Sequence, residues 1–287
     1  MKIGVSSYSF QRLMKEQGYT YIDVCNKAKE LGFDGIEFSG MEPDKYSHGE
    51  SDIECAKAIR AHCEEIGLEI INFCTGANLL AEDIEAEVAR LFHCVDIAEA
   101  LGAPTMRHDV CSSKLPAKPR YNWQDAMADI VPHIRRVTEY AKSKGIRTCT
   151  ENHGQLFQAP ERVEALIRAV DNDNYGWLCD IGNFLCADVD PLRAVAIAAP
   201  YTFHAHAKDF IFKSATEKKP EGFIDTLAGN HIRGTVIGHG IVPVEACVGL
   251  LKKAGYDKWL SVEFEGLECN LKALEIGLNF LRTVIAD

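Results

Sequence analysis

The sequence lacks the features that mark nucleic-acid-binding, membrane or secreted proteins. Positive charge is scarce: 31 Lys and Arg against 42 Asp and Glu give a formal net charge of −11, whereas phosphate backbones are bound by clustered cations. No apolar run is long enough to span a bilayer. The N-terminus, MKIGVSSYSF, has one Lys, no apolar core and no small-residue cleavage site. We therefore expect no signal peptide, no membrane or nucleic-acid partner, and a cytoplasmic location.

Cysteines are numerous, yet they do not form a disulfide pattern. There are 11 of them, an odd number, and no C-x-x-C pair occurs. Several lie inside apolar runs, where a secreted disulfide framework would not place them. We expect buried free thiols.

Short apolar runs alternate with longer amphipathic stretches along the whole chain. The expected strands are residues 2–7, 35–40, 69–75, 105–110, 146–152, 176–182, 203–209 and 259–265. Expected helices, with apolar residues at three- and four-residue steps, include 22–32, 53–67, 88–102 and 165–172. Glycines just before the next strand, as in left-handed helix ends, are Gly32, Gly67, Gly102, Gly145 and Gly255.

This repeated strand–helix order predicts an α/β fold with a parallel sheet and right-handed connections. Eight such units fit a (β/α)8 TIM barrel, which we expect to form a single domain over residues 1–287. A doubly wound sheet is the alternative, but it rarely uses eight regular units. Residues 209–243 break the strand–helix alternation with Gly, Pro and charged residues. We expect them to form a long loop after strand seven, on the active-site face of the barrel.

Hard ligands stand at the carboxyl ends of strands five to eight. They are Glu151, Asp180, His206 and Glu263. Parallel barrel strands carry these positions to one rim, and charged groups in apolar strands are costly to bury unless they are paired or bind a metal. Three carboxylates and one imidazole suit one divalent ion, with Mn2+, Mg2+ or Co2+ favoured and Zn2+ as a further option.

Side-chain alternation predicts a second layer above these ligands. His153, Lys208 and Glu265 would share a face with them and stand at the mouth of the site. His204, one layer deeper, is expected to be a hydrogen-bonded core histidine. His108 and Tyr8 are weaker candidates for the wall.

Motifs along the chain resemble those of the xylose-isomerase-like TIM-barrel superfamily, which contains sugar phosphate isomerases and epimerases. The most specific are E-N-H-G at 151–154, D-x-G-N-F at 180–184, H-x-K-D at 206–209, G-x-G at 238–240 and E-x-E-G at 263–266. The resemblance implies that Glu151, Asp180, His206 and Glu263 bind one divalent metal. In the related ketose 3-epimerases, the two Glu ligands are also the acid/base pair, which here are Glu151 and Glu263.

The resemblance implies an isomerase or epimerase that acts on a small polyhydroxy ketone or aldehyde, with or without a phosphate, through an enediolate. Two departures from the epimerase pattern weaken this reading: Asn183 stands where those enzymes have His, and His239 stands where an acidic residue is usual. His153 as a catalytic base instead predicts a dehydratase or lyase on a keto-polyol or oxo-glycoside. Lys208, Arg233 and Lys213 are candidates for binding substrate or a phosphate.

Two other functions share the fold. An endonuclease-four-like nuclease needs extra histidines, and both Asn183 and the negative charge argue against it. A silent sugar-binding barrel would have lost one or more ligands, yet all four are present. Barrels of this kind often pair through loops, so a homo-oligomer is compatible with the resemblance.

Overall fold

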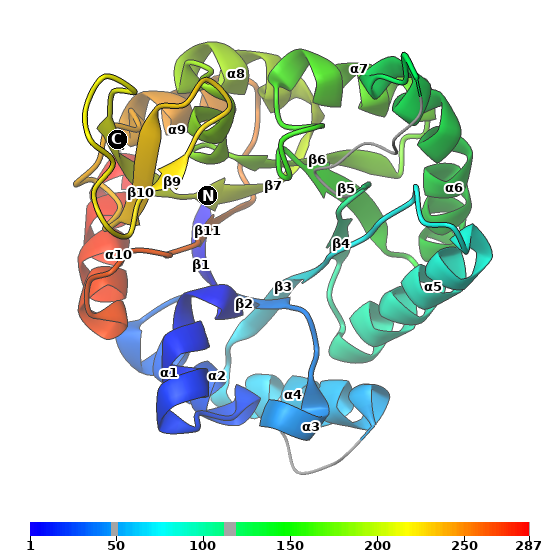
Figure 1. Cartoon of the computed structure of the whole chain (residues 1–287). Helices are drawn as coiled ribbons and strands as arrows, with labels where there is room; N and C mark the ends of the chain where they lie inside the picture. The colour runs from blue at the N-terminus through cyan, green and yellow to red at the C-terminus, as the bar shows by residue number, and fades with distance from the viewer. Residues whose placement is uncertain (47–50, 112–118, 287) are drawn as a thin grey trace.

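The computed structural model describes residues 1–46, 51–111 and 119–286. A closed eight-stranded parallel barrel forms the inner ring, and helices form the outer ring (Figure 1). The strands are β1 (Lys2–Ser6), β2 (Gly35–Ser39), β3 (Glu69–Thr75), β4 (Thr105–His108), β5 (Arg147–Glu151), β6 (Tyr175–Asp180), β7 (Thr202–Ala207) and β11 (Trp259–Val262). β1 closes the ring by pairing with both β2 and β11. The predicted TIM barrel is confirmed.

The helices of the outer ring begin at residues that cap them in several cases. They are α1 (Gln11–Gln17), α2 (Tyr21–Leu31), α3 (Pro43–Tyr46), α4 (Asp52–Ile66), α5 (Ile84–Leu101), α6 (Trp123–Ser143), α7 (Pro160–Val170), α8 (Pro191–Ala198), α9 (Val244–Lys253) and α10 (Asn270–Ala286), with short 3-10 turns at Ser7–Phe10, Asn183–Ala187 and Ala199–Tyr201. At α2, Thr20 and Asp23 form a capping box, and Gly32 ends the helix in the left-handed conformation at φ 92°. These local signals explain why helix positions can be read from sequence.

Alternating side chains divide the strands between two environments. Outward residues such as Met106 and Trp177 join the large apolar core between barrel and helices. Inside the barrel, Cys74, Cys149 and Leu178 form a small apolar cluster. Above this cluster, toward the carboxyl ends of the strands, the interior is polar, and this is where the site lies.

Residues 209–243 contain a small antiparallel sheet, which corrects the expectation of a plain loop. It comprises β8 (Asp209–Lys213), β9 (Ile224–Asp225) and β10 (His231–Thr235), in the order β8–β10–β9. Ile232 in β10 is fully buried and pairs with Phe212 and Ile224. The strands are short and separated by Gly, Pro and charged residues, which hid their alternation in the sequence.

A buried carboxylate, Asp209, ties the two ends of this insertion together. Asp209 accepts backbone N–H hydrogen bonds from Phe210 (2.8 Å), Gly238 (2.9 Å), Gly240 (2.8 Å) and Val242 (3.0 Å). A Cβ on Gly240 would lie 2.1 Å from Asp209 Oδ1. The H-x-K-D and G-x-G motifs are thus two halves of one structural contact.

No described helix combines the length and the apolar character that a membrane span requires. The cysteines are free thiols, most of them buried, with Cys269 exposed. Cys25 and Cys63, for instance, lie between α2 and α4 with their sulfur atoms 3.5 Å apart.

Replacement of Asp209 by Ala is expected to lower the free energy of unfolding by about 2–4 kcal/mol, because it leaves several buried N–H donors without their charged acceptor. Urea denaturation measures this difference. Asp225→Ala is the matched control: Asp225 is exposed and pairs with Lys219 and His231, so its loss is expected to cost less than about 1 kcal/mol. Equal effects of the two substitutions would refute the role given to Asp209.

Candidate metal centre

Four ligand-type side chains from four neighbouring strands meet at the carboxyl end of the barrel. Glu151 and Asp180 are the last residues of β5 and β6. His206 lies in β7 opposite Asp180, and Glu263 directly follows β11. Their ligand atoms all lie within 4.8 Å of one another. We call these four residues the metal cluster.

The metal cluster contains buried polar atoms that suit a cation. Asp180 Oδ2 and His206 Nδ1 have no hydrogen-bond partner among the described residues. They lie 3.9 Å apart, and His206 Nδ1 is 3.7 Å from Glu263 Oε2. An unpaired buried polar atom is costly, so such atoms call for a ligand. Three carboxylates and an imidazole fit one divalent ion.

Asp180 is fixed by its own strand end and by β5. Its Oδ1 accepts backbone N–H hydrogen bonds from Gly182 (2.8 Å) and Asn183 (2.9 Å), which leaves Oδ2 for the metal cluster. The Asn152 side chain donates to the Asp180 carbonyl oxygen (2.8 Å) and accepts from the Asp180 N–H (3.1 Å). A Cβ on Gly182 would lie 2.6 Å from the Lys208 carbonyl oxygen, so glycine is required there.

Both carboxylate oxygens of Glu151 are held by donors. Arg107 Nη2 lies 2.6 Å from Oε2, and Asn183 Nδ2 donates to Oε1 at 2.7 Å. Arg107 takes an inward position on β4, where it pairs in register with Cys74 and Cys149. These two donors offset part of the negative charge of Glu151 and fix the orientation of its carboxylate. The arrangement favours Glu151 as a metal ligand.

Lys208 brings a buried ammonium group to the edge of the metal cluster. Its Nζ lies 2.5 Å from Glu263 Oε2, 3.4 Å from Asp180 Oδ2 and 3.8 Å from Glu265 Oε2. It also donates to Asn183 Oδ1 at 3.2 Å. Burial alone would lower the pKa of Lys208, but the carboxylates hold it well above its usual value. Burial would likewise raise the pKa of Glu263, which Lys208 and His206 hold well below normal.

His153 stands at the mouth of the site with half of its side chain exposed. Its Nδ1 lies 3.2 Å from Asp109 Oδ1, and that same oxygen is 3.0 Å from Arg107 Nη2. The hydrogen bond that His153 makes to the Asp109 carboxylate raises the pKa of His153. A chain of contacts therefore runs from His153 through Asp109 and Arg107 to Glu151.

The remaining residues predicted for the site do not all lie near the metal cluster. Glu265 lies beside Lys208, as expected for the mouth. Tyr8 is nearby, where burial and the Glu265 carboxylate raise its pKa. Arg233 lies in β10 and pairs with Glu268 (3.0 Å); within the described residues it has no recorded contact with the metal cluster.

His108 does not join the site either. Its side chain is fully buried, with Nδ1 2.8 Å from the Asp109 carbonyl oxygen and its ring 6.0 Å from the Tyr175 ring. Because Arg107 points into the barrel, the adjacent His108 points outward toward the helices.

Sequence reasoning missed Glu37, Arg107 and Asp109. Glu37 is fully buried in β2, with Oε1 2.7 Å from His206 Nε2 and Oε2 2.9 Å from His204 Nε2. His204 thus lies one layer below the metal cluster, as expected. All three missed residues are charged groups in apolar strand segments, the same signal that identified the ligands on strands five to eight.

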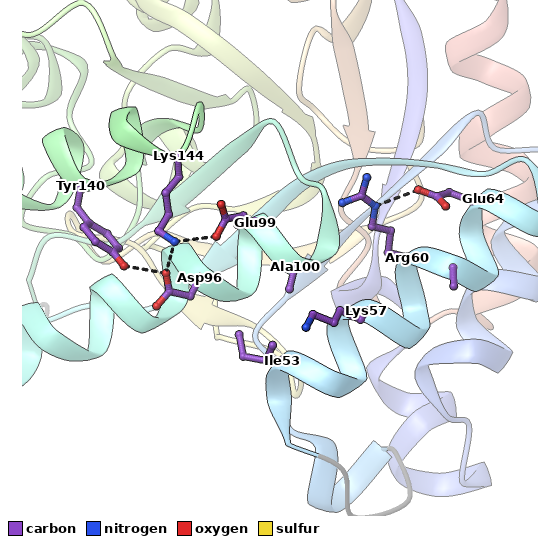
Figure 2. Close-up of a pocket in the computed structure, with 10 residues that line it drawn as sticks. Ile53, Lys57, Arg60, Glu64, Asp96, Glu99, Ala100, Tyr140 and Lys144 are labelled. Atoms are coloured by element: carbon purple, nitrogen blue, oxygen red, sulfur yellow. Dashed lines mark hydrogen bonds and ion pairs between the residues drawn. The ribbon is translucent and has the colours of Figure 1, made fainter.

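The outer surface also has a groove of about 700 Å³ between α4, α5 and α6 (Figure 2). Its cations are largely occupied, since Arg60 pairs with Glu64, and Lys144 pairs with Asp96 and Glu99. No member of the metal cluster lines it.

The family model described as "Xylose isomerase-like TIM barrel" matches residues 25–284, and the chain belongs to this family. Two similar curated proteins are the rhizopine catabolism protein MocC of Rhizobium meliloti and the inosose dehydratase of Lacticaseibacillus casei. The first is 24% identical over 86% of this chain and 76% of its own length. The second is 25% identical over 86% of this chain and 87% of its own.

Solved structures agree on the fold. The probable 3-DHS dehydratase AsbF of Bacillus anthracis superposes with a TM-score of 0.76, at 20% identity and covering 98% of this chain and 99% of that one. D-allulose 3-epimerase of Methylomonas sp. gives 0.73 at 16% identity, covering 99% and 98%. IOLI protein, described with a binding zinc atom, gives 0.74 at 17% identity, covering 100% and 98%. The similar proteins thus include an inosose dehydratase by sequence, and a probable dehydratase and an epimerase that share the fold.

Loss of either Asp180 or His206 is expected to abolish metal retention without loss of the fold. We expect Asp180→Asn and His206→Ala to weaken Mn2+ binding by more than about 100-fold, since even outer-shell partners of a metal contribute about 10–100-fold. Isothermal titration calorimetry measures the affinity, and circular dichroism checks the fold. Glu275→Gln, an exposed change on α10, is the control that keeps wild-type affinity. Wild-type affinity in a folded Asp180→Asn or His206→Ala variant would rule out this site.

Proposed function

We propose that this protein is a divalent-metal-dependent dehydratase that acts on a small keto-polyol or a related polyhydroxy carbonyl compound. The reaction removes a proton from the carbon beside the carbonyl group and then expels the hydroxyl group on the next carbon as water. The proposal rests on one observation: Arg107 and Asn183 each hold one carboxylate oxygen of Glu151.

Proton transfer needs a group that is free to gain and lose a proton near the working pH. Both oxygens of Glu151 are already engaged by donors, and Lys208 keeps Glu263 ionised. His153 is another titratable group at the mouth of the site, and its ring is hydrogen-bonded to the Asp109 carboxylate. Asp109 holds its Nδ1 and makes the imidazole a stronger base, which leaves Nε2 as the nitrogen that faces a substrate.

We assign His153 the removal of the proton beside the carbonyl and its return to the departing oxygen, so that substrate becomes product plus one water. Lys208, charged and fixed by Glu263, is a hydrogen-bond donor to the oxygen on which negative charge develops. Glu265 is placed to bind a substrate hydroxyl beside it. A bound divalent ion, with Mn2+, Mg2+ or Co2+ favoured, supplies Lewis-acid polarisation of the carbonyl group.

Relatives support this class of substrate. The inosose dehydratase and MocC match most of this chain at about a quarter identity, and AsbF, a probable dehydratase, matches its whole length in fold. A nuclease is disfavoured because the chain carries a net charge of −11.

Isomerisation or epimerisation of a sugar is the second candidate. It is favoured by one observation, that Glu151 and Glu263 both belong to the metal cluster, so that two carboxylates flank a common centre. In that reaction the proton returns to carbon, and no water is lost.

Incubation of Mn2+- or Mg2+-loaded protein with a panel of inososes, other keto-polyols, ketohexoses and their phosphates in D2O separates these outcomes. We expect a product lighter by one water, detected by mass spectrometry, with deuterium exchange beside the carbonyl detected by NMR. Exchange with a new sugar isomer and no water loss would replace the dehydratase by the isomerase. No exchange from any compound would refute both.

His153→Gln is expected to lower kcat by about 100-fold or more, since general acid–base catalysis contributes about 10²–10⁴-fold. Mn2+ affinity should stay unchanged, because His153 is not a ligand. His239→Gln, at an exposed histidine of the loop before α9, is the matched control with full activity. Full turnover of His153→Gln would remove that residue from the mechanism.

A further inference from the structure

We propose that Glu37 is a positioning residue that holds His206 for metal binding, with His204 as its second partner. The inference deepens the metal site on which the proposed function rests. It assigns a role to a buried carboxylate on β2, on the far side of His206 from the metal cluster.

The two nitrogens of His206 face different groups. Nδ1 belongs to the metal cluster, where it lies 3.9 Å from Asp180 Oδ2. Nε2 lies 2.7 Å from Glu37 Oε1. Metal-binding histidines usually direct the second ring nitrogen to a carboxylate or carbonyl, which sets the ring orientation and makes the first nitrogen a better ligand. The contact to Glu37 is short, although the ring is not aligned for a linear hydrogen bond, so charge and proximity dominate it.

Glu37 is itself held in place on its other oxygen. Asn72 Nδ2 donates to Oε2 at 3.1 Å, and His204 Nε2 lies 2.9 Å from the same oxygen. Asn72 is in turn oriented by Thr105 Oγ1, which donates to its Oδ1 at 2.9 Å. An ionised carboxylate with no solvent exposure is costly unless it is paired. Asn72 of β3 and His204 of β7 therefore hold Glu37 in place, and Glu37 in turn holds His206.

Glu37, His204 and His206 also have ligand atoms close enough to hold a cation of their own. That alternative would make the ring of His206 bridge two ions, which requires loss of its last N–H proton. With Nδ1 already in the metal cluster, positioning is the simpler role. The two readings differ in metal stoichiometry.

The test measures Mn2+ binding to metal-free Glu37→Gln and Glu37→Leu by isothermal titration calorimetry, with metal content determined by mass spectrometry. We expect wild type to bind one ion per chain. Glu37→Gln should keep that stoichiometry with affinity lowered by about 10–100-fold, and Glu37→Leu should lose more, because only Gln keeps a polar oxygen beside His206 Nε2.

Thr105→Val is the matched control. It disturbs the same buried network three contacts away from His206, so it should lower thermal stability without a change in metal affinity. Wild-type affinity in folded Glu37→Gln would overturn the proposal. Two ions in wild type, with one lost from the Glu37 variants, would also overturn it, since Glu37 would then be a ligand. Because no substrate is involved, the result is independent of which reaction the enzyme catalyses.

If both Glu37 variants fail to fold, 15N-histidine NMR of Zn2+-loaded wild type gives the same answer. We expect His206, assigned by comparison with His204→Asn, to carry its proton on Nε2, with Nδ1 bound to the metal. A His206 bound through Nε2 would contradict the positioning role.

Discussion

The carboxyl end of the barrel depends on one constraint: it buries several carboxylates, whose like charges repel one another. Glu151, Asp180 and Glu263 bring three carboxylates within 4.8 Å of one another. Ionised groups removed from water repel one another strongly unless cations or hydrogen bonds offset the loss of hydration. Burial accordingly raises the pKa of Asp180. The neighbouring residues follow from the need to compensate this charge.

Two fixed cations compensate part of this charge, and the metal cluster is a candidate site for a metal ion that would compensate more. Arg107 pairs with Glu151, and Lys208 pairs with Glu263, so each glutamate has its own positive partner. Asp180 Oδ2 and His206 Nδ1 keep no hydrogen-bond partner within the described residues. In the proposed reaction, this asymmetry would let the metal cluster hold an ion while a group outside the cluster transfers the proton. On this account, the partners of the ligands distinguish a dehydratase from an epimerase.

Much of the fold was predictable because its signals are local. Each barrel strand is a short apolar run, and helices end at glycines such as Gly32 and Gly67 with positive φ. The small sheet was missed because β9 has only two residues and its pairing with β10 depends on tertiary contacts. Short strands leave too little alternation for a sequence pattern to reveal.

The clustering of the four candidate ligands could be predicted because each lies at or next to the carboxyl end of an apolar strand. Their partners were harder to see: Glu37, Arg107 and Asp109 lie on β2 and around β4, far in sequence from strands five to eight. Only closure of the barrel brings these strands opposite one another. His108 was a candidate for the wall although it points outward, because the register that decides which residues point inward is not evident in a four-residue strand.

The central claim is that one divalent ion binds between Glu151, Asp180, His206 and Glu263. Anomalous diffraction from crystals grown with Mn2+, recorded at the manganese absorption edge, tests it most directly. The account predicts a single peak within bonding distance of Asp180 Oδ2 and His206 Nδ1. A peak between Glu37 and His204, or no peak in the barrel at saturating Mn2+, would contradict it.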